Sequence, residues 1–309
     1  MGGIILKKLI VLFLTVLMVM TMSGCSGSSN GNGGSDEPEK IKRIADDTST
    51  NLLSFSAPEK FDKAERFIEQ SVDGEIIEKD ITFYFNDGTE LTYAYAKDQS
   101  LEGLIDLDSL EKIENGDDVF YVYVSGSSYV AFAMKDNDLY AVKYALLDGQ
   151  SRDPFDEAVK AVSFKDNGPM ITNDLDLGGI SYTIDPSLNV YKLVTNMTED
   201  PDGNQLEKYV LWKYGQSDDE MDFRFLIRVF RNSTVEDQKK QDKEYEERTV
   251  NGISYTVLCD EGNPYIYYTQ HGDDVYEIRN SGKSNGWFTS RSEESYTAFE
   301  AFVNSISFN

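Results

Sequence analysis

Hydrophobic and polar residues alternate with a period of two along most of the chain beyond residue 50. In residues 222–230 apolar side chains take every odd position, and two of the even positions are arginine. Residues 126–142 and 262–278 alternate in the same way on either side of the polar sequences Lys-Asp-Asn-Asp and His-Gly-Asp-Asp. Strict alternation indicates strands with one buried face, and polar Gly/Asn/Asp tetrads indicate turns. We therefore predict antiparallel hairpins over these segments.

Two segments show the helical period instead. Residues 291–306 place apolar side chains at i, i+3, i+6, i+7 and i+10, namely Tyr296, Phe299, Phe302, Val303 and Ile306. In residues 152–162, Asp153 is the predicted N-cap and Pro154 suits the first helical position. Both segments are predicted to be amphipathic helices that cover a sheet.

The elements recur in the same order in two stretches of the chain. Four pairs of segments match in order, with the offset growing only where loops are expected: 73–85 with 202–214, 93–102 with 227–236, 114–143 with 250–279, and 161–164 with 305–308. This ordered recurrence indicates a tandem duplication. We predict repeat domains over residues 51–168 and 169–309.

Each unit is predicted to be an antiparallel sheet closed by a C-terminal amphipathic helix, so the predicted fold class is α+β. The order of elements resembles that of PsbP/Mog1-like domains and of repeat lipoproteins from Gram-positive bacteria. This resemblance implies a binding or assembly role, with no enzymatic activity.

Residues 1–24 have the pattern of an export signal. Lys7 and Lys8 precede the apolar run Leu9–Met22, which is shorter than the roughly 20 residues of a membrane span. The sequence "MSGC" follows, and it resembles the lipobox of bacterial lipoproteins at Ser23, Gly24 and Cys25, with Met22 in place of an aliphatic residue. The resemblance implies cleavage before Cys25 and lipid on its sulfur. An uncleaved anchor or a plain secretory signal is the alternative.

Residues 25–50 begin with a Gly/Ser/Asn-rich stretch that is too polar to form a core, so we interpret them as a flexible tether. A tether after an acylated cysteine would hold the folded part outside the cytoplasm, at the extracytoplasmic face of the cell membrane. The envelope type stays open, although the tether and the acidic chain favour a Gram-positive surface.

The chain is strongly acidic, with 29 Lys and Arg against 55 Asp and Glu and a net charge of −26. Loss of two lysines with residues 1–24 would take this charge to −28. Such a surface repels phosphate groups, which argues against nucleic-acid binding.

Candidate binding residues lie in the second repeat, where the outward face could bring Lys213, Arg224 and Arg228 near Tyr267. Cationic and aromatic side chains suit an anionic ligand, a glycan or a protein partner in the envelope. A solvated or helix-covered face is the alternative interpretation.

Catalytic and metal-binding signals are sparse. Asp174 and Asp176 precede a glycine turn as acids do in calcium loops, but no glutamate follows at the position that an EF-hand requires. His271 lies in a predicted turn, and Cys259 lies in a predicted strand as a small apolar residue. The sequence contains neither a P-loop nor a CxxC or HExxH motif. We expect no cofactor, and an envelope hydrolase using carboxylates or a calcium ion is the alternative to a binding protein.

Overall fold

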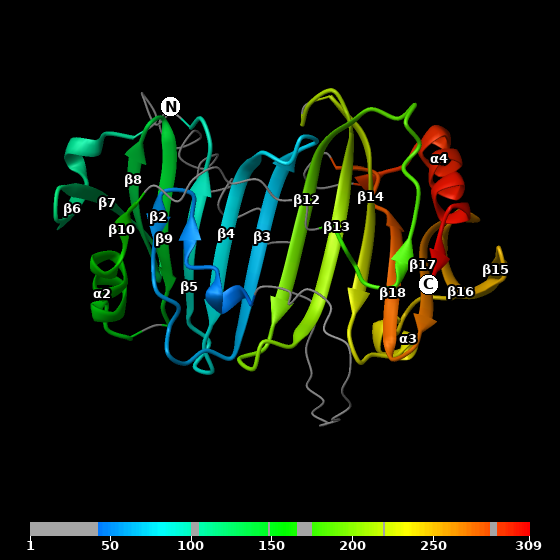
Figure 1. Ribbon diagram of the computed structural model, residues 1–309, viewed down its shortest axis with the longest axis horizontal. Coiled ribbons are helices and arrows are strands. Elements are labelled where there is room, and N and C mark those ends of the chain that lie inside the picture. The colour runs from blue at the N-terminus through cyan, green and yellow to red at the C-terminus, as the bar shows by residue number, and fades with distance from the viewer. Residues whose placement is uncertain (1–42, 100–104, 148, 166–174, 219, 285–288) are drawn as a thin grey trace.

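The computed structural model describes residues 43–309 except 100–104, 148, 166–174, 219 and 285–288. Fourteen antiparallel strands form one continuous sheet in the order β15-β16-β17-β18-β14-β13-β12-β3-β4-β5-β9-β8-β7-β6 (Figure 1). The strands are β3 Lys63–Ser71, β4 Ile76–Tyr84, β5 Glu90–Ala96, β6 Glu111–Asn115, β7 Asp118–Ser125, β8 Ser128–Lys135, β9 Asp138–Ala145, β12 Val190–Glu199, β13 Gln205–Gly215, β14 Met221–Phe230, β15 Glu246–Val250, β16 Ile253–Asp260, β17 Asn263–His271 and β18 Asp274–Asn280.

The strand order reads the same outward from the centre in both directions. From the central pair, β3-β4-β5-β9-β8-β7-β6 runs one way and β12-β13-β14-β18-β17-β16-β15 runs the other. The central pairing joins β12 to β3 from Lys192 opposite Ser71 to Glu199 opposite Ala64. The two stretches of sequence therefore share one sheet through their first long strands.

Small sheets tie the ends of each half together. In the first half β1 (Ser49–Thr50), β2 (Leu53–Ser54) and β10 (Ser163–Phe164) pair, and in the second half β11 (Ile180–Ser181) pairs with β21 (Ser307–Phe308). A further pair is formed by β19 (Lys283–Ser284) and β20 (Thr289–Ser290).

The predicted α+β class is wrong. Of the described residues 52% are strand and 13% are helix, and three α-helices accompany the single 14-stranded sheet. Within its own half, the first long strand, β3 or β12, has a hydrogen-bonding partner on one edge alone. The two remaining edges pair with each other. Alternation predicts which face of a strand is buried but not which strand pairs with its edge, so separate PsbP/Mog1-like sheets were the wrong expectation.

The helices α2 (Asp153–Ala161) and α4 (Glu293–Asn304) form where the helical period predicted them and lie toward opposite ends of the sheet (Figure 1). Arg152, and not Asp153, is the N-cap of α2, while Ser292 caps α4 by accepting a hydrogen bond from the Ser295 amide. The third helix, α3 (Val235–Gln238), begins at a capping box formed by Thr234 and Asp237. In the described ranges no helix is long and apolar enough to cross a membrane.

One face of the sheet, which we call the helix face, carries two large apolar clusters. The first packs α2 through Phe155 and Val159 against β4–β9, and the second packs α4 through Phe299 and Val303 against β13–β18. The second cluster follows the predicted alternation, because it contains Phe223, Phe225, Ile227 and Val229 of β14.

Candidate functional site

The opposite face is covered differently at its ends and at its centre. Near one end, the segment around the 3-10 helix η3 (Leu107–Ser109) packs Leu107 against small residues of β5 and β9. Near the other end, Val235 of α3 packs against Leu258 and Tyr268. At the centre the apolar cluster consists, in the described part of the chain, of sheet residues alone: Phe67, Val194, Tyr209, Leu211 and Leu226.

We call this central region the junction face, because it spans the β3–β12 pairing. It comprises this apolar cluster and the polar side chains around it, Glu65, Glu69, Glu78, Asp80, Tyr84, Lys192, Asn196, Glu207, Lys213, Arg224 and Arg228. Directly opposite residues in antiparallel strands point to the same side, so the registers of β4, β3, β12, β13 and β14 place these groups together.

A closed ring of ion pairs connects the two halves on this face. The Glu69 carboxylate lies 2.8 Å from the ammonium of Lys192 and 2.5 Å from that of Lys213. Asp218, in the turn after β13, lies 2.6 Å from Lys192 and 3.2 Å from Lys213. Burial acts to raise the pKa of Asp218, but the hydrogen bond from Lys192 and the two positive charges outweigh it and lower the pKa to about 2.

A second bonded group lies beside the ring. The two carboxylate oxygens of Glu65 accept hydrogen bonds from the Tyr84 hydroxyl at 3.0 Å and from the Asn196 amide at 2.6 Å. Asn196 is 1% exposed, and its side-chain oxygen has no hydrogen-bond partner among the described residues. Tyr84 also carries the Lys63 ammonium over its ring, 4.4 Å from the centroid.

Two carboxyl groups of β4 lack such partners. No hydrogen bond or ion pair from a described residue reaches the half-buried Glu78. Burial and then the charge of Glu69 raise its pKa to about 7, against the more distant positive charges of Lys213 and Lys192. Asp80 is 8% exposed, and its Oδ1 has no hydrogen-bond partner in the described ranges. Burial and then the Glu78 charge raise the pKa of Asp80 well above its usual range, against the opposing charge of Lys143. The two groups form an acidic position without a counter-ion in hydrogen-bonding contact.

The structure brings three of the four candidate binding residues to the junction face. Lys213 belongs to the ion-pair ring, while Arg224 donates to the carbonyls of Ser281 and Gly282 at 3.3 and 3.2 Å. Arg228 lies 3.3 Å from the Glu207 carboxylate and stacks over Tyr209 and Phe230. All three cations are therefore bound by groups of the chain itself.

Tyr267 lies on the helix face instead, in the cluster under α4, and is 3% exposed. Its ring meets Tyr255 and Phe299 edge to face. The four residues thus do not form one surface. Tyr267 and Tyr268 occupy opposite faces of β17, so the alternation left the direction of Tyr267 undecided.

The calcium and thiol candidates have other roles in the structure. Asp176 is exposed and accepts the Gly178 amide at 2.7 Å within its own turn, whereas Asp174 and Cys25 lie outside the described residues. The described residues contain no group of three His, Cys, Asp or Glu side chains arranged to hold a metal ion. Cys259 is half-buried and donates to Glu246 at 3.2 Å, and burial followed by that contact raises its pKa to about 11. Such a thiol is a poor nucleophile.

His271 lies at the predicted turn between β17 and β18, opposite Asp274, and its ring stacks on Phe308 at 4.6 Å. The hairpin prediction for this residue is confirmed. The contact connects the turn to the C-terminal strand, which gives the histidine a packing role.

The four acids of β3 and β4 were missed by sequence reasoning. Glu65, Glu69, Glu78 and Asp80 occupy alternate positions that are typical of a solvated face. The sequence did contain one signal of this site. The neighbouring strands β3 and β4 each carry two acids on the same face, and β12 and β13 each carry a lysine that could pair with them.

No protein-family model matches the chain. No curated protein matches it either. Among solved structures, the chain is similar to the immunity protein TplEi of T6SS from Pseudomonas aeruginosa, as the apo form (10% identity) and complexed with "L" peptide (11% identity), each with TM-score 0.24 and covering 84% of this chain and 95% of the other. It is also similar to MucB in complex with MucA(peri), at 8% identity and TM-score 0.19, covering 80% of this chain and 93% of that one. Similarities at this level transfer no function to the present chain.

Proposed function

We propose that the protein is a binding protein of the bacterial cell envelope, anchored by lipid on Cys25, and that its junction face takes a partner presenting a positively charged group. The envelope location rests on the leader in residues 1–24, on the match of Ser23, Gly24 and Cys25 to a lipobox, and on the tether that follows. The tandem duplication is likewise a proposal, supported by the matching strand order of the two halves.

The sign of the partner's charge follows from which groups on the face have partners. Lys213, Arg224 and Arg228 are bound within the chain, so an anion would have to displace existing contacts. Among the described residues of the face, the carboxyl groups of Glu78 and Asp80 and the side-chain oxygen of Asn196 have spare acceptor capacity, and all three favour a donor over an anion. Ionising a half-buried carboxyl costs free energy. An ammonium or guanidinium group beside Glu78 would offset this cost, and its attraction to the carboxylate would contribute to the free energy of binding.

The apolar cluster beside these acids supplies contact area. Phe67 and Leu211 are half-buried sheet residues, and Phe67 lies directly opposite Asp80 in the β3–β4 register. An apolar centre with charged groups around it is the usual composition of a protein interface. The combination favours a protein or peptide partner over a free cation.

The hydrolase alternative is less well supported by this geometry. Hydrolysis catalysed by a pair of carboxyl groups needs one of them protonated and the other ionised. The pKa values of Glu78 and Asp80 are both raised, and the Glu69 carboxylate is already held in ion pairs with two lysines. Two neighbouring carboxyl groups with raised pKa values, Glu78 and Asp80, instead suit a site to which a bound partner brings a positive charge.

Photo-crosslinking in membranes tests the proposal. A photoreactive amino acid in place of Leu211, in the lipid-anchored chain, is expected to give a discrete crosslinked partner. This product should disappear when Glu78→Gln and Asp80→Asn are combined, and it should persist in the control Asp118→Asn, which removes an acid on β7. Absence of a crosslinked product, or a product insensitive to the double variant, would contradict the proposal.

A further inference from the structure

The two edge strands of the sheet, β6 and β15, are held differently by their neighbouring helices. At β6, Arg152 at the start of α2 makes two hydrogen bonds to the Glu111 carboxylate, at 2.6 and 2.7 Å. Asn115, at the other end of β6, donates to the carbonyls of Val159 and Val162 at 3.1 and 2.7 Å. Helix α2 is thus tied to this edge at both ends.

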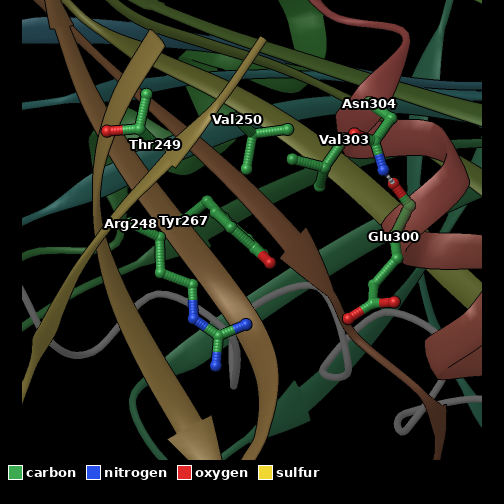
Figure 2. Close-up of a pocket in the computed structure, with 7 residues that line it drawn as sticks. All are labelled: Arg248, Thr249, Val250, Tyr267, Glu300, Val303 and Asn304. Atoms are coloured by element: carbon green, nitrogen blue, oxygen red, sulfur yellow. Dashed lines mark hydrogen bonds between the residues drawn. The ribbon is translucent and has the colours of Figure 1, made fainter. Parts of the chain in front are cut away.

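At β15 the corresponding space is open. Asn251, just after β15, donates to the Asn304 carbonyl at 2.5 Å. Beside this contact a cavity of about 330 Å³ separates β15 from α4 (Figure 2), and a second of about 650 Å³ continues past Asn304 toward Phe308. Figure 2 shows Arg248, Val250 and Tyr267 on one wall and Glu300 and Val303 on the other.

The backbone of β15 offers hydrogen bonds along this opening. The two-residue turn Asn251–Gly252 has positive φ at both positions (51° and 80°), so Val250 and Ile253 form a hydrogen-bonded pair. Bonded and non-bonded pairs alternate in an antiparallel ladder. The N–H and C=O groups of Glu247 and Thr249 therefore point away from β16, and no described residue bonds to them.

The charges around the opening specify the kind of strand that could pair here. Arg248 is already bound by Glu246 at 2.5 Å, whereas Glu300 has no ion pair with any described residue. Glu247 is also exposed on β15, but its side chain lies on the opposite face of the strand, where it accepts a hydrogen bond from the Thr256 hydroxyl at 2.9 Å. Glu300 is therefore the acid that faces the opening, and a carboxylate without an ion pair there attracts a basic segment.

We propose that β15 is a strand-addition site for an extended basic peptide of a protein partner. The peptide would bond to the outward N–H and C=O groups of Glu247 and Thr249, with alternate side chains directed toward the groove and a lysine or arginine paired with Glu300. Backbone hydrogen bonds supply affinity in this mode of recognition, and the groove supplies selectivity. The site is separate from the junction face and does not depend on it.

Peptide selection tests this proposal. Binders to the full chain are selected from a random decapeptide library, and the affinity of the synthetic peptides is then measured by fluorescence anisotropy. We expect enriched sequences in which Lys or Arg alternate with apolar residues. Thr249→Pro removes an outward N–H while leaving the β15–β16 hydrogen bonds. It should lower the affinity for these peptides at least tenfold. The control is Lys112→Pro, at an outward position of the other edge strand, β6, which should leave affinity unchanged.

A second variant avoids reliance on the proline. Glu300→Lys should also reduce the affinity at least tenfold, while Glu293→Lys, at the opposite end of the exposed side of α4, should change it less than twofold. Hydrogen exchange of the Glu247 and Thr249 amides should slow in the presence of a selected peptide. Failure to enrich any basic sequence, or binding that Thr249→Pro and Glu300→Lys leave intact, would overturn the proposal.

Discussion

Glu69 and Lys213 form an ion pair of 2.5 Å across the centre of the sheet, although they are 144 positions apart in the chain. Glu69 belongs to the first half and Lys213 to the second. Lys192, on the strand between them, binds the same carboxylate. The pairing shows that the two halves are joined by side-chain chemistry as well as by the β3–β12 ladder.

Glu69→Gln is expected to destabilise the protein by about 2 kcal/mol, because two partly buried lysines lose a shared counter-charge. Urea unfolding at pH 7 measures the change. The control Glu75→Gln removes an ion pair of the same 2.5 Å length with Lys97 at an exposed position, and it should have little effect. Equal effects of the two variants would contradict a stabilising role of the ring.

Glu78 should make stability depend on pH. Its pKa rises from 4.5 to about 7 on folding, so the folded state binds more protons than the unfolded state between these values. Stability should therefore be highest below about pH 4.5 with respect to this group and fall as pH rises toward 7, by on the order of 2 kcal/mol.

Glu78→Gln should flatten this part of the curve of unfolding free energy against pH. Glu75→Gln serves as the control, because its carboxyl is exposed. If the slope between pH 4.5 and 7 is the same in wild type and Glu78→Gln, the raised pKa of Glu78 is refuted.

Local patterns predicted much of the helix face. The odd-numbered residues from Phe223 to Val229 are buried, and Phe299 and Val303 place α4 on them. These features depend on neighbours in sequence, so alternation and the helical period suffice to find them.

The junction face could not be predicted in the same way. Whether Glu69 is solvated or shared between two lysines depends on β12 pairing with β3, and this pairing joins residues more than 120 positions apart. Likewise, the face of β17 to which Tyr267 belongs could not be predicted, because apolar and aromatic residues occupy both sides of this strand. The sequence carries the side-chain types, and the long-range register decides which of them meet.

Asn115 should contribute to stability through its two bonds to the end of α2. Asn115→Ala leaves the Val159 and Val162 carbonyls without these donors and is expected to cost about 1–2 kcal/mol. Asn251→Gly, at the more open β15 edge, removes one exposed bond and should cost less, because glycine tolerates the positive φ of this turn position. Thermal unfolding of the two variants compares them, and a larger loss for Asn251→Gly would contradict the difference between the two edges.

Cys25 is expected to carry lipid. Metabolic labelling with a palmitate analogue should mark the wild-type chain and leave Cys25→Ser unlabelled, while Cys259→Ser should label as wild type does. Label retained by Cys25→Ser would rule out acylation at this residue as the anchor.

The most direct test of the proposed binding face is a ¹³C NMR titration of the Glu78 and Asp80 carboxyl groups, alone and with the crosslink-identified partner bound. Without the partner, Glu78 should titrate near pH 7 and Asp80 well above its usual range. On binding, both pKa values should fall, because a cation now stabilises the ionised carboxylates. Ordinary pKa values in the free protein, or raised values that binding leaves unchanged, would contradict the account.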